Sequence, residues 1–66
     1  MTRFEREFKE AQHDAGLGIV ILMERKAELQ ELEKKGRAEK NGWRREILAQ
    51  EYVKLQREYD EIAELV

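Results

Sequence analysis

A seven-residue run, "LGIVILM" from Leu17 to Met23, is apolar at every position except Gly18. A run of this length could form a buried strand, but the chain has no second strand-like run for it to pair with. We therefore expect a helix, and a helix that is apolar all round is buried on all sides. One further helix of the same chain can cover one of those sides. The run therefore predicts that a second subunit covers the other.

The length of the chain points the same way. Sixty-six residues form one domain at most, and a chain this short buries only about 60% of the surface that its unfolded form exposes. Small domains are usually stabilised by disulfides, a structural metal or oligomerisation. The absence of cysteine excludes disulfides and thiolate zinc sites, and one histidine cannot build a closed zinc site. Self-association remains, and a dimer is favoured.

Charged residues make up 42% of the chain, but the net charge is only −2 and the apolar residues recur with helical spacing. This pattern indicates a folded helical protein instead of a disordered one. The longest apolar run has seven residues, far fewer than the roughly 20 needed to cross a bilayer. The N-terminus has no hydrophobic segment of signal-peptide type. We expect a cytoplasmic protein with no membrane partner.

The spacing of apolar residues predicts one helical domain with these elements: a helix over about 2–15, a bend at 16–18, a helix over about 17–35, a turn at 36–41 and a helix over about 42–66. Thr2 and Glu5 have the spacing of a capping box at the first helix start. Gly16 and Gly18 each cost a helix roughly 1 kcal/mol, so they mark either a bend or a close approach of backbones. Gly36 is expected to end the second helix.

The last helix carries a heptad pattern of coiled-coil type, with Leu48, Leu55 and Ile62 at one position of the repeat. The fold class is therefore all-α: an antiparallel helical hairpin, with a short N-terminal third segment, that assembles into a dimeric or higher helical bundle. In shape it resembles the helical hairpins that dimerise into four-helix bundles. The residues expected in the oligomer core are Leu17, Ile19, Val20, Ile21, Leu22, Met23, Leu29, Leu48, Tyr52, Leu55, Tyr59 and Ile62.

Residues 34–45, the basic turn, concentrate positive charge. Six cations stand against Glu39 alone, a local charge of +5, whereas residues 1–33 sum to −3 and residues 46–66 to −4. Arg44 and Arg45 lie in the first turn of a helix, where the helix dipole favours acids. With Trp43 and the free amides of that helix start, they form a candidate anion or partner site. The residues of this site are Lys34, Lys35, Arg37, Lys40, Trp43, Arg44 and Arg45. Solvated charge or self-association is the alternative.

Trp43 itself has two interpretations. It can pack beneath the turn or against a neighbouring subunit, or it can be a binding hot spot, because tryptophan often dominates the energy of interfaces.

Glu10 and His13, in "EAQH", have the Glu-x-x-His spacing of metal sites in helical bundles. Such sites need further glutamates from two other helices, and none is distinguished here, so we expect no metal and no cofactor. No pattern brings a nucleophile together with a base, so we expect no enzyme. The sequence favours a small non-enzymatic oligomeric interaction protein, of a kind common in phages and mobile elements, that regulates, inhibits or adapts a larger macromolecular partner, with a protein partner favoured. The alternative is nucleic-acid or nucleotide binding through the basic turn 34–45.

Overall fold

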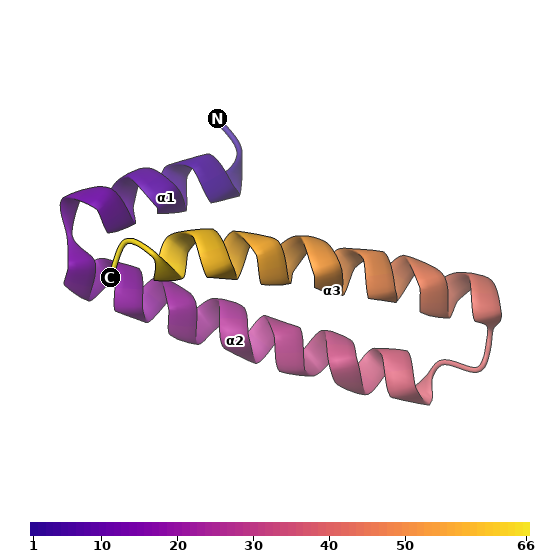
Figure 1. Ribbon diagram of the computed structural model, residues 1–66. Coiled ribbons are helices and arrows are strands. Elements are labelled where there is room, and N and C mark those ends of the chain that lie inside the picture. Colours follow the sequence, from indigo (N-terminus) through magenta and orange to yellow (C-terminus); the bar gives the residue numbers. More distant parts are fainter.

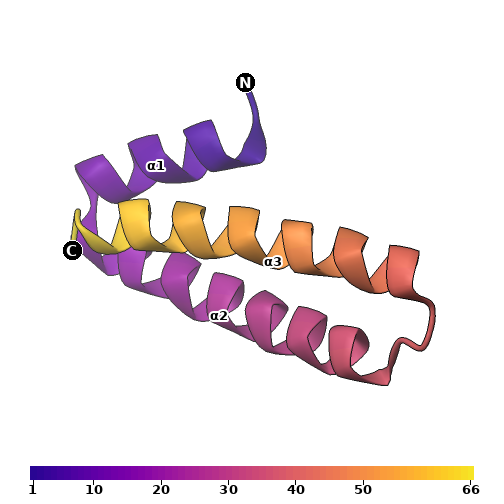
Figure 2. The ribbon, with the colours of Figure 1, turned by 45° about the vertical axis from the view of Figure 1, so that its right-hand side comes forward.

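The computed structural model describes residues 1–66 and contains three helices and no strand. They are α1 (Arg3–His13), α2 (Ala15–Ala38) and α3 (Gly42–Ala63). Figure 1 shows α2 and α3 running antiparallel as a hairpin, with α1 folded back along it. The second view shows the same arrangement, with α1 reaching only part of the way from the C-terminal end toward the turn (Figure 2). The all-α prediction is confirmed.

The first helix begins at a cap and places one apolar stripe on the hairpin. The hydroxyl of Thr2 accepts a hydrogen bond from the Glu5 amide at 3.2 Å, which satisfies one free donor of the helix start. The rings of Phe4 and Phe8 contact each other at a tilt of 53°, with their centroids 5.8 Å apart. They and Ala11 pack on the buried core of the hairpin.

The break between α1 and α2 lies at Asp14, not at the expected bend over residues 16–18. The Asp14 carboxylate accepts hydrogen bonds from the amides of Gly16 and Leu17 at 2.9 and 3.3 Å, so it caps the start of α2. Its own amide donates to the Glu10 carbonyl at 2.9 Å and ends α1. One aspartate therefore serves both helix ends, and Gly16 lies inside the first turn of α2.

Gly18 does not mark a bend but allows α1 and the C-terminus to approach α2 closely. A Cβ atom at this position would lie 2.7 Å from Val66 Cγ1 and 3.1 Å from Ala11 Cβ. Both distances are shorter than an ordinary contact, so the missing side chain allows α1 and the C-terminus to meet α2 here.

The turn is shorter than expected, because α2 runs through Gly36 to Ala38 and leaves residues 39–41 as the connection. Gly36 does not adopt the left-handed conformation that ends many helices, since no residue of the chain has positive φ. Glu39, in an extended conformation, ends the helix. Asn41 caps α3 by accepting from the Arg44 amide at 3.1 Å. The last helix ends at Ala63 instead of continuing to residue 66.

The buried core of a single chain is small. Only seven of the 66 residues are buried, and two of those seven are charged. The buried apolar residues are Ala11, Ile21, Leu29 and Ile62, with Leu22 and Leu65 among the partly buried ones beside them. Such a core is too small to account for all the apolar residues of the chain.

The apolar run from Leu17 to Met23 is therefore covered on one side only. Within it Ile21 is buried and Leu22 is half-buried, whereas Ile19, Val20 and Met23 are 53%, 47% and 68% exposed. Leu17 is also exposed. Of the other residues expected in an oligomer core, Leu48, Tyr52, Leu55 and Tyr59 are half-buried. None of the three helices is both long enough and apolar enough to cross a membrane.

Candidate functional site

The basic turn occupies the end of the molecule opposite the C-terminus (Figure 1). The structure engages two of its six cations within the chain. Arg37 pairs with Glu33 one helical turn before it, at 2.5 Å. The Arg45 guanidinium donates to the Glu39 carbonyl from Nε at 3.2 Å and from Nη2 at 3.0 Å. Arg45 therefore satisfies a carbonyl at the end of α2. This contact accounts for an arginine in the first turn of α3 without a bound ligand.

The remaining four cations make no side-chain hydrogen bond or ion pair and are exposed: Lys34, Lys35, Lys40 and Arg44. The expected anion site at the start of α3 is partly filled by the chain itself. The amide of Arg44 donates to the Asn41 side chain, and that of Arg45 donates to the Asn41 carbonyl. These two amides are therefore engaged within the chain. The four unpaired charged side chains are what a partner can contact.

Trp43 points away from the rest of the chain. It lies in the first turn of α3 and is 71% exposed, whereas Ile47, one turn later, is half-buried. The first interpretation, packing beneath the turn, is thus not realised within one chain. Trp43 and Arg44 are adjacent, exposed and without a partner, so the contact candidate narrows to these two residues.

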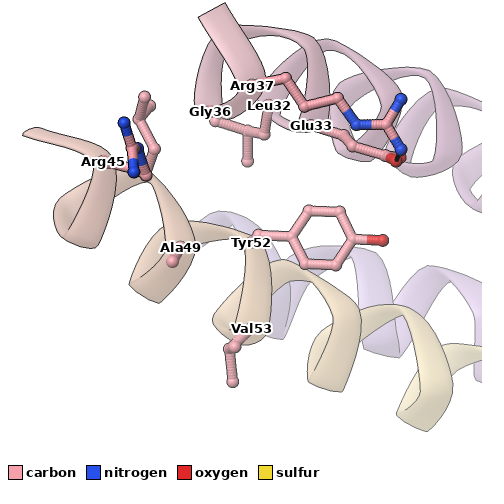
Figure 3. A pocket seen from close by; sticks show the side chains of 9 residues that line it. Leu32, Glu33, Gly36, Arg37, Arg45, Ala49, Tyr52 and Val53 are labelled. Carbon is pink, nitrogen blue, oxygen red and sulfur yellow. Dashed lines mark hydrogen bonds and ion pairs between the residues drawn. The ribbon is translucent and has the colours of Figure 1, made fainter. Parts of the chain in front are cut away.

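A groove of about 770 Å³ opens between α2 and α3 beside the turn. It is lined by Leu32, Glu33, Gly36, Arg37, Arg45, Leu48, Ala49, Tyr52 and Val53. In Figure 3 the Tyr52 ring lies across the space between the helices, with Arg37 on the α2 side and Arg45 toward the turn. The groove is largely apolar and bordered by the two arginines. No residue of α1 lines it.

A buried ionic cluster joins the three helices at the other half of the molecule. Arg25 of α2 is 1% exposed and donates to Glu7 of α1 from Nε at 2.9 Å and from Nη2 at 2.5 Å. Its Nη1 donates to Glu58 of α3 at 2.8 Å. The guanidinium also lies 5.6 Å from the centre of the Phe4 ring. Every buried side-chain nitrogen and oxygen has a hydrogen-bond partner.

The rim of this cluster is closed by Arg3, which lies 3.4 Å from Glu7 and hydrogen-bonds Glu28 at 3.0 Å. The hydrogen bond to Glu28 raises the pKa of Arg3 above its ordinary value, although partial burial opposes the rise. An arginine with a raised pKa stays charged throughout the range in which proteins fold. Arg3 is thus a permanent cation between α1 and α2.

Reasoning from the sequence missed this cluster, because charges on helices usually lie on solvated faces. A signal was present in the spacing. Arg25 follows Ile21 by four residues and precedes Leu29 by four, so it lies on the buried stripe of α2. Glu58 likewise follows Leu55 by three residues and precedes Ile62 by four, on the same stripe of α3.

The Glu10 and His13 pair lies at the end of α1, where Glu10 is half-buried and His13 is exposed. The structure brings together no group of three or more side chains that could hold a metal ion.

Comparison of the chain with models of protein families, with curated proteins and with solved structures gave no match.

Proposed function

We propose that this protein is a small non-enzymatic interaction protein that regulates, inhibits or adapts a larger protein, and that it binds this partner through Trp43 and Arg44. The observation that carries the proposal is the 71% exposure of Trp43. An indole left in water costs free energy that burial against a partner recovers, at roughly 25 cal/mol per Å² of apolar surface. Exposed tryptophan beside an unpaired arginine is the composition typical of binding hot spots.

The partner expected for this site has an apolar pocket bordered by acidic groups. Trp43 would fill the pocket, and Arg44 would pair with a carboxylate at its edge. The unpaired lysines nearby, Lys34, Lys35 and Lys40, add positive charge around the contact. Because contacts at the rim of an interface contribute little affinity, most of the binding free energy is expected from Trp43.

The test is a quantitative pull-down from the native host with wild-type protein and three variants. Trp43→Ala and Arg44→Ala address the site, and Gln50→Ala, an exposed residue of α3, is the matched control. A protein retained by wild type and Gln50→Ala should be lost with Trp43→Ala, by at least about tenfold for a hot spot. Equal retention by Trp43→Ala would contradict the proposal.

The purified partner then allows a direct readout. Trp43 is the only tryptophan, so its fluorescence reports this site without a label. Burial of the indole should shift its emission to shorter wavelength on binding. Because Trp43 is exposed, the free energy of unfolding of Trp43→Ala should stay within about 0.5 kcal/mol of wild type, and lost binding cannot be attributed to misfolding.

We further propose that the protein self-associates, with a dimer favoured. This proposal is supported by the exposure of Ile19, Val20 and Met23 on a helix whose opposite side forms the core. Large exposed apolar groups of this kind are typical of surfaces that meet another protein. Sedimentation equilibrium at micromolar concentration should give a mass above the 7.9 kDa of one chain. A stable monomer would contradict this proposal and leave the one on Trp43 untouched.

Nucleic-acid binding is the second candidate, and it is favoured by one observation: the basic turn carries four exposed, unpaired cations, Lys34, Lys35, Lys40 and Arg44, together with an exposed indole that can stack on a base. The two candidates differ in their response to salt. Binding to nucleic acid should weaken steeply between about 50 and 200 mM salt because counterions are released, whereas a protein contact centred on Trp43 should weaken much less, since most of its free energy comes from apolar burial. A filter-binding titration with single-stranded RNA and DNA that shows no retention at low salt would remove this candidate.

A further inference from the structure

The two sides of the α2–α3 hairpin are unlike. On one side α1 packs, with Glu7 reaching Arg25 and with Phe8 packed on the core. The groove beside the turn lies on the other side, because its residue Val53 belongs to the stripe of α3 that continues to Asp60, whereas Glu58 and Glu61 face α1. We name the side of the hairpin that contains the groove the open face.

The open face continues along the whole hairpin. Eighteen residues make five turns of an α-helix, so Ile19 is in line with Arg37 on α2, and Ala63 is in line with Arg45 on α3. Met23, one turn on from Ile19, is 68% exposed, and Ile19 is 53% exposed. The groove near the turn and the exposed apolar side chains near the other end therefore belong to one surface.

The charge on this surface changes sign from end to end. At the turn it carries Arg37 and Arg45, which border the groove. Toward the other end it carries Asp60, which accepts a hydrogen bond from Gln56 at 3.0 Å and is otherwise exposed. The last ten residues of the chain, 57–66, hold one cation and four acids, a net charge of −3, although Glu58 and Glu61 lie on the side toward α1. Along α3 the open face thus carries Arg45 near the turn, the apolar Ala49 and Val53 midway, and Asp60 at the acidic end of the chain.

We propose that the open face docks onto the open face of a second copy in antiparallel orientation, so that each basic turn lies over the acidic end of the other chain. This inference rests on the self-association proposed above and adds the surface and the orientation. The partner is a second copy because the surface is complementary to itself. Reversing its direction sets Arg45 opposite Asp60 of the second copy and brings the apolar residues midway along α3, Ala49 and Val53, together across the axis.

The charges favour this arrangement over the other twofold arrangement of two open faces. An axis along the hairpin would place turn over turn, where Arg45 of one chain meets the Arg37–Glu33 pair of the other instead of an acidic end. The two basic turns would then repel each other, since like charges facing each other across an interface cost several kcal/mol. An axis across the hairpin avoids this, and it places α3 antiparallel on α3 of the second copy.

The size of the molecule suits such a dimer. It measures 42 × 20 × 16 Å, so each of its long sides is of the order of the 800 Å² that each partner of a stable interface buries. A dimer formed over a large part of the open face therefore reaches the usual interface area.

Disulfide cross-linking tests the orientation, since the chain has no cysteine of its own. In the antiparallel dimer the twofold axis passes near residues 52 and 53, midway along α3. Ala49→Cys of one chain should therefore meet Gln56→Cys of the other, and a mixture of the two variants should form a mixed disulfide dimer under mild oxidation. The matched control is a mixture of Gln50→Cys and Arg57→Cys, which has the same span along α3 but lies on its outer side. It should give no such product.

Three other outcomes would overturn all or part of this inference. If Ala49→Cys instead pairs with Gln30→Cys of α2, the two chains are parallel, and the orientation is overturned while self-association stands. If sedimentation equilibrium shows a monomer, both this inference and the proposed self-association are overturned. If a dimer forms and none of these cysteines cross-links, the dimer uses another surface and the inference is overturned.

Charge reversal gives an independent measurement. Asp60→Lys should raise the dissociation constant of the dimer by at least about tenfold, because it sets a second cation opposite Arg45. Glu61→Lys makes the same charge change beside Phe4 and Phe8, on the side that α1 covers, and should have little effect. Equal effects of the two variants on dimerisation would contradict the proposed surface.

Discussion

Gly18 and Gly36 lie in the same helix but have opposite surroundings. Gly18 is buried against Ala11 and Val66, and an added Cβ would lie closer to Val66 than real contacts allow and unusually close to Ala11. Gly36 has no atom within 4 Å of the position that a Cβ would take. Neither has positive φ, so backbone conformation requires glycine at neither position. Only the close packing at Gly18 requires it.

These surroundings predict opposite effects of the same substitution. Gly36→Ala should stabilise the protein by about 0.5–1 kcal/mol, because alanine is the better helix former and meets open space. Gly18→Ala should destabilise it by about 1–3 kcal/mol, because the methyl group forces α1 or the C-terminus outward. Urea unfolding followed by far-UV circular dichroism measures both. A stabilising Gly18→Ala would show that Val66 and Ala11 yield easily.

At the scale of the helices, the contact between α1 and the hairpin depends on charge as well as apolar packing. Arg25 is shared by a carboxylate from each of the other two helices, Glu7 and Glu58. A buried ion pair adds little net stability when complete, because its desolvation offsets its attraction. Loss of one member is costly, since it leaves a buried charge without a partner.

Replacement of Arg25 should therefore be far more damaging than replacement of the whole cluster. Arg25→Ala should lower the free energy of unfolding by about 3–5 kcal/mol, because the buried Glu7 carboxylate keeps only its weaker contact with Arg3. The triple variant Glu7→Leu, Arg25→Met, Glu58→Leu should unfold at a free energy similar to or up to about 4 kcal/mol above that of wild type. Thermal and urea unfolding give the comparison.

Should Arg25→Ala fail to fold, Glu58→Gln remains informative. It keeps the Arg25–Glu7 pair and weakens a half-buried contact, so a loss of about 1 kcal/mol is expected. A triple variant less stable than Arg25→Ala would contradict this account of the cluster.

These elements also show what could be predicted from sequence. Helix type and the hairpin followed from apolar spacing, and the cap at Thr2 followed from a local motif. The break lies two residues before the predicted bend, because the capping carboxylate of Asp14 starts a helix that continues through Gly16 and Gly18. The cluster at Arg25 could not be derived, since Glu7 and Glu58 lie 18 and 33 residues away and meet it only through the packing of three helices. The exposure of Trp43 likewise depends on how the turn closes.

At the scale of the whole molecule, the apolar run Leu17 to Met23 has one side inside the chain and one outside it. Ile21 is 4% exposed, whereas Met23, two residues later, is 68% exposed. Ile21 therefore contributes to the folding of one chain, whereas Met23 is available for the association of two chains.

Aspartate at these two positions should have different consequences. Ile21→Asp buries a charge without a partner and should unfold the chain, with loss of the helical circular dichroism signal. Met23→Asp leaves the core intact, so it should keep the helical signal and unfold within about 0.5 kcal/mol of wild type as a monomer. Met23 lies toward the end of the open face that meets the basic turn of the second copy, so Met23→Lys should weaken the proposed dimer by repulsion from that turn, which sedimentation equilibrium measures. A Met23→Lys protein that dimerises like wild type would place the interface elsewhere.

The basic turn has one more consequence, and it concerns rates of encounter. The molecule is 42 Å long, several times the roughly 8 Å over which salt screens a charge under physiological conditions. A molecule that approaches the turn therefore responds to the local charge of +5 and not to the net charge of −2. Acidic partners are drawn toward the end that presents Trp43 and turned into place before contact, which raises the association rate constant and makes it sensitive to ionic strength.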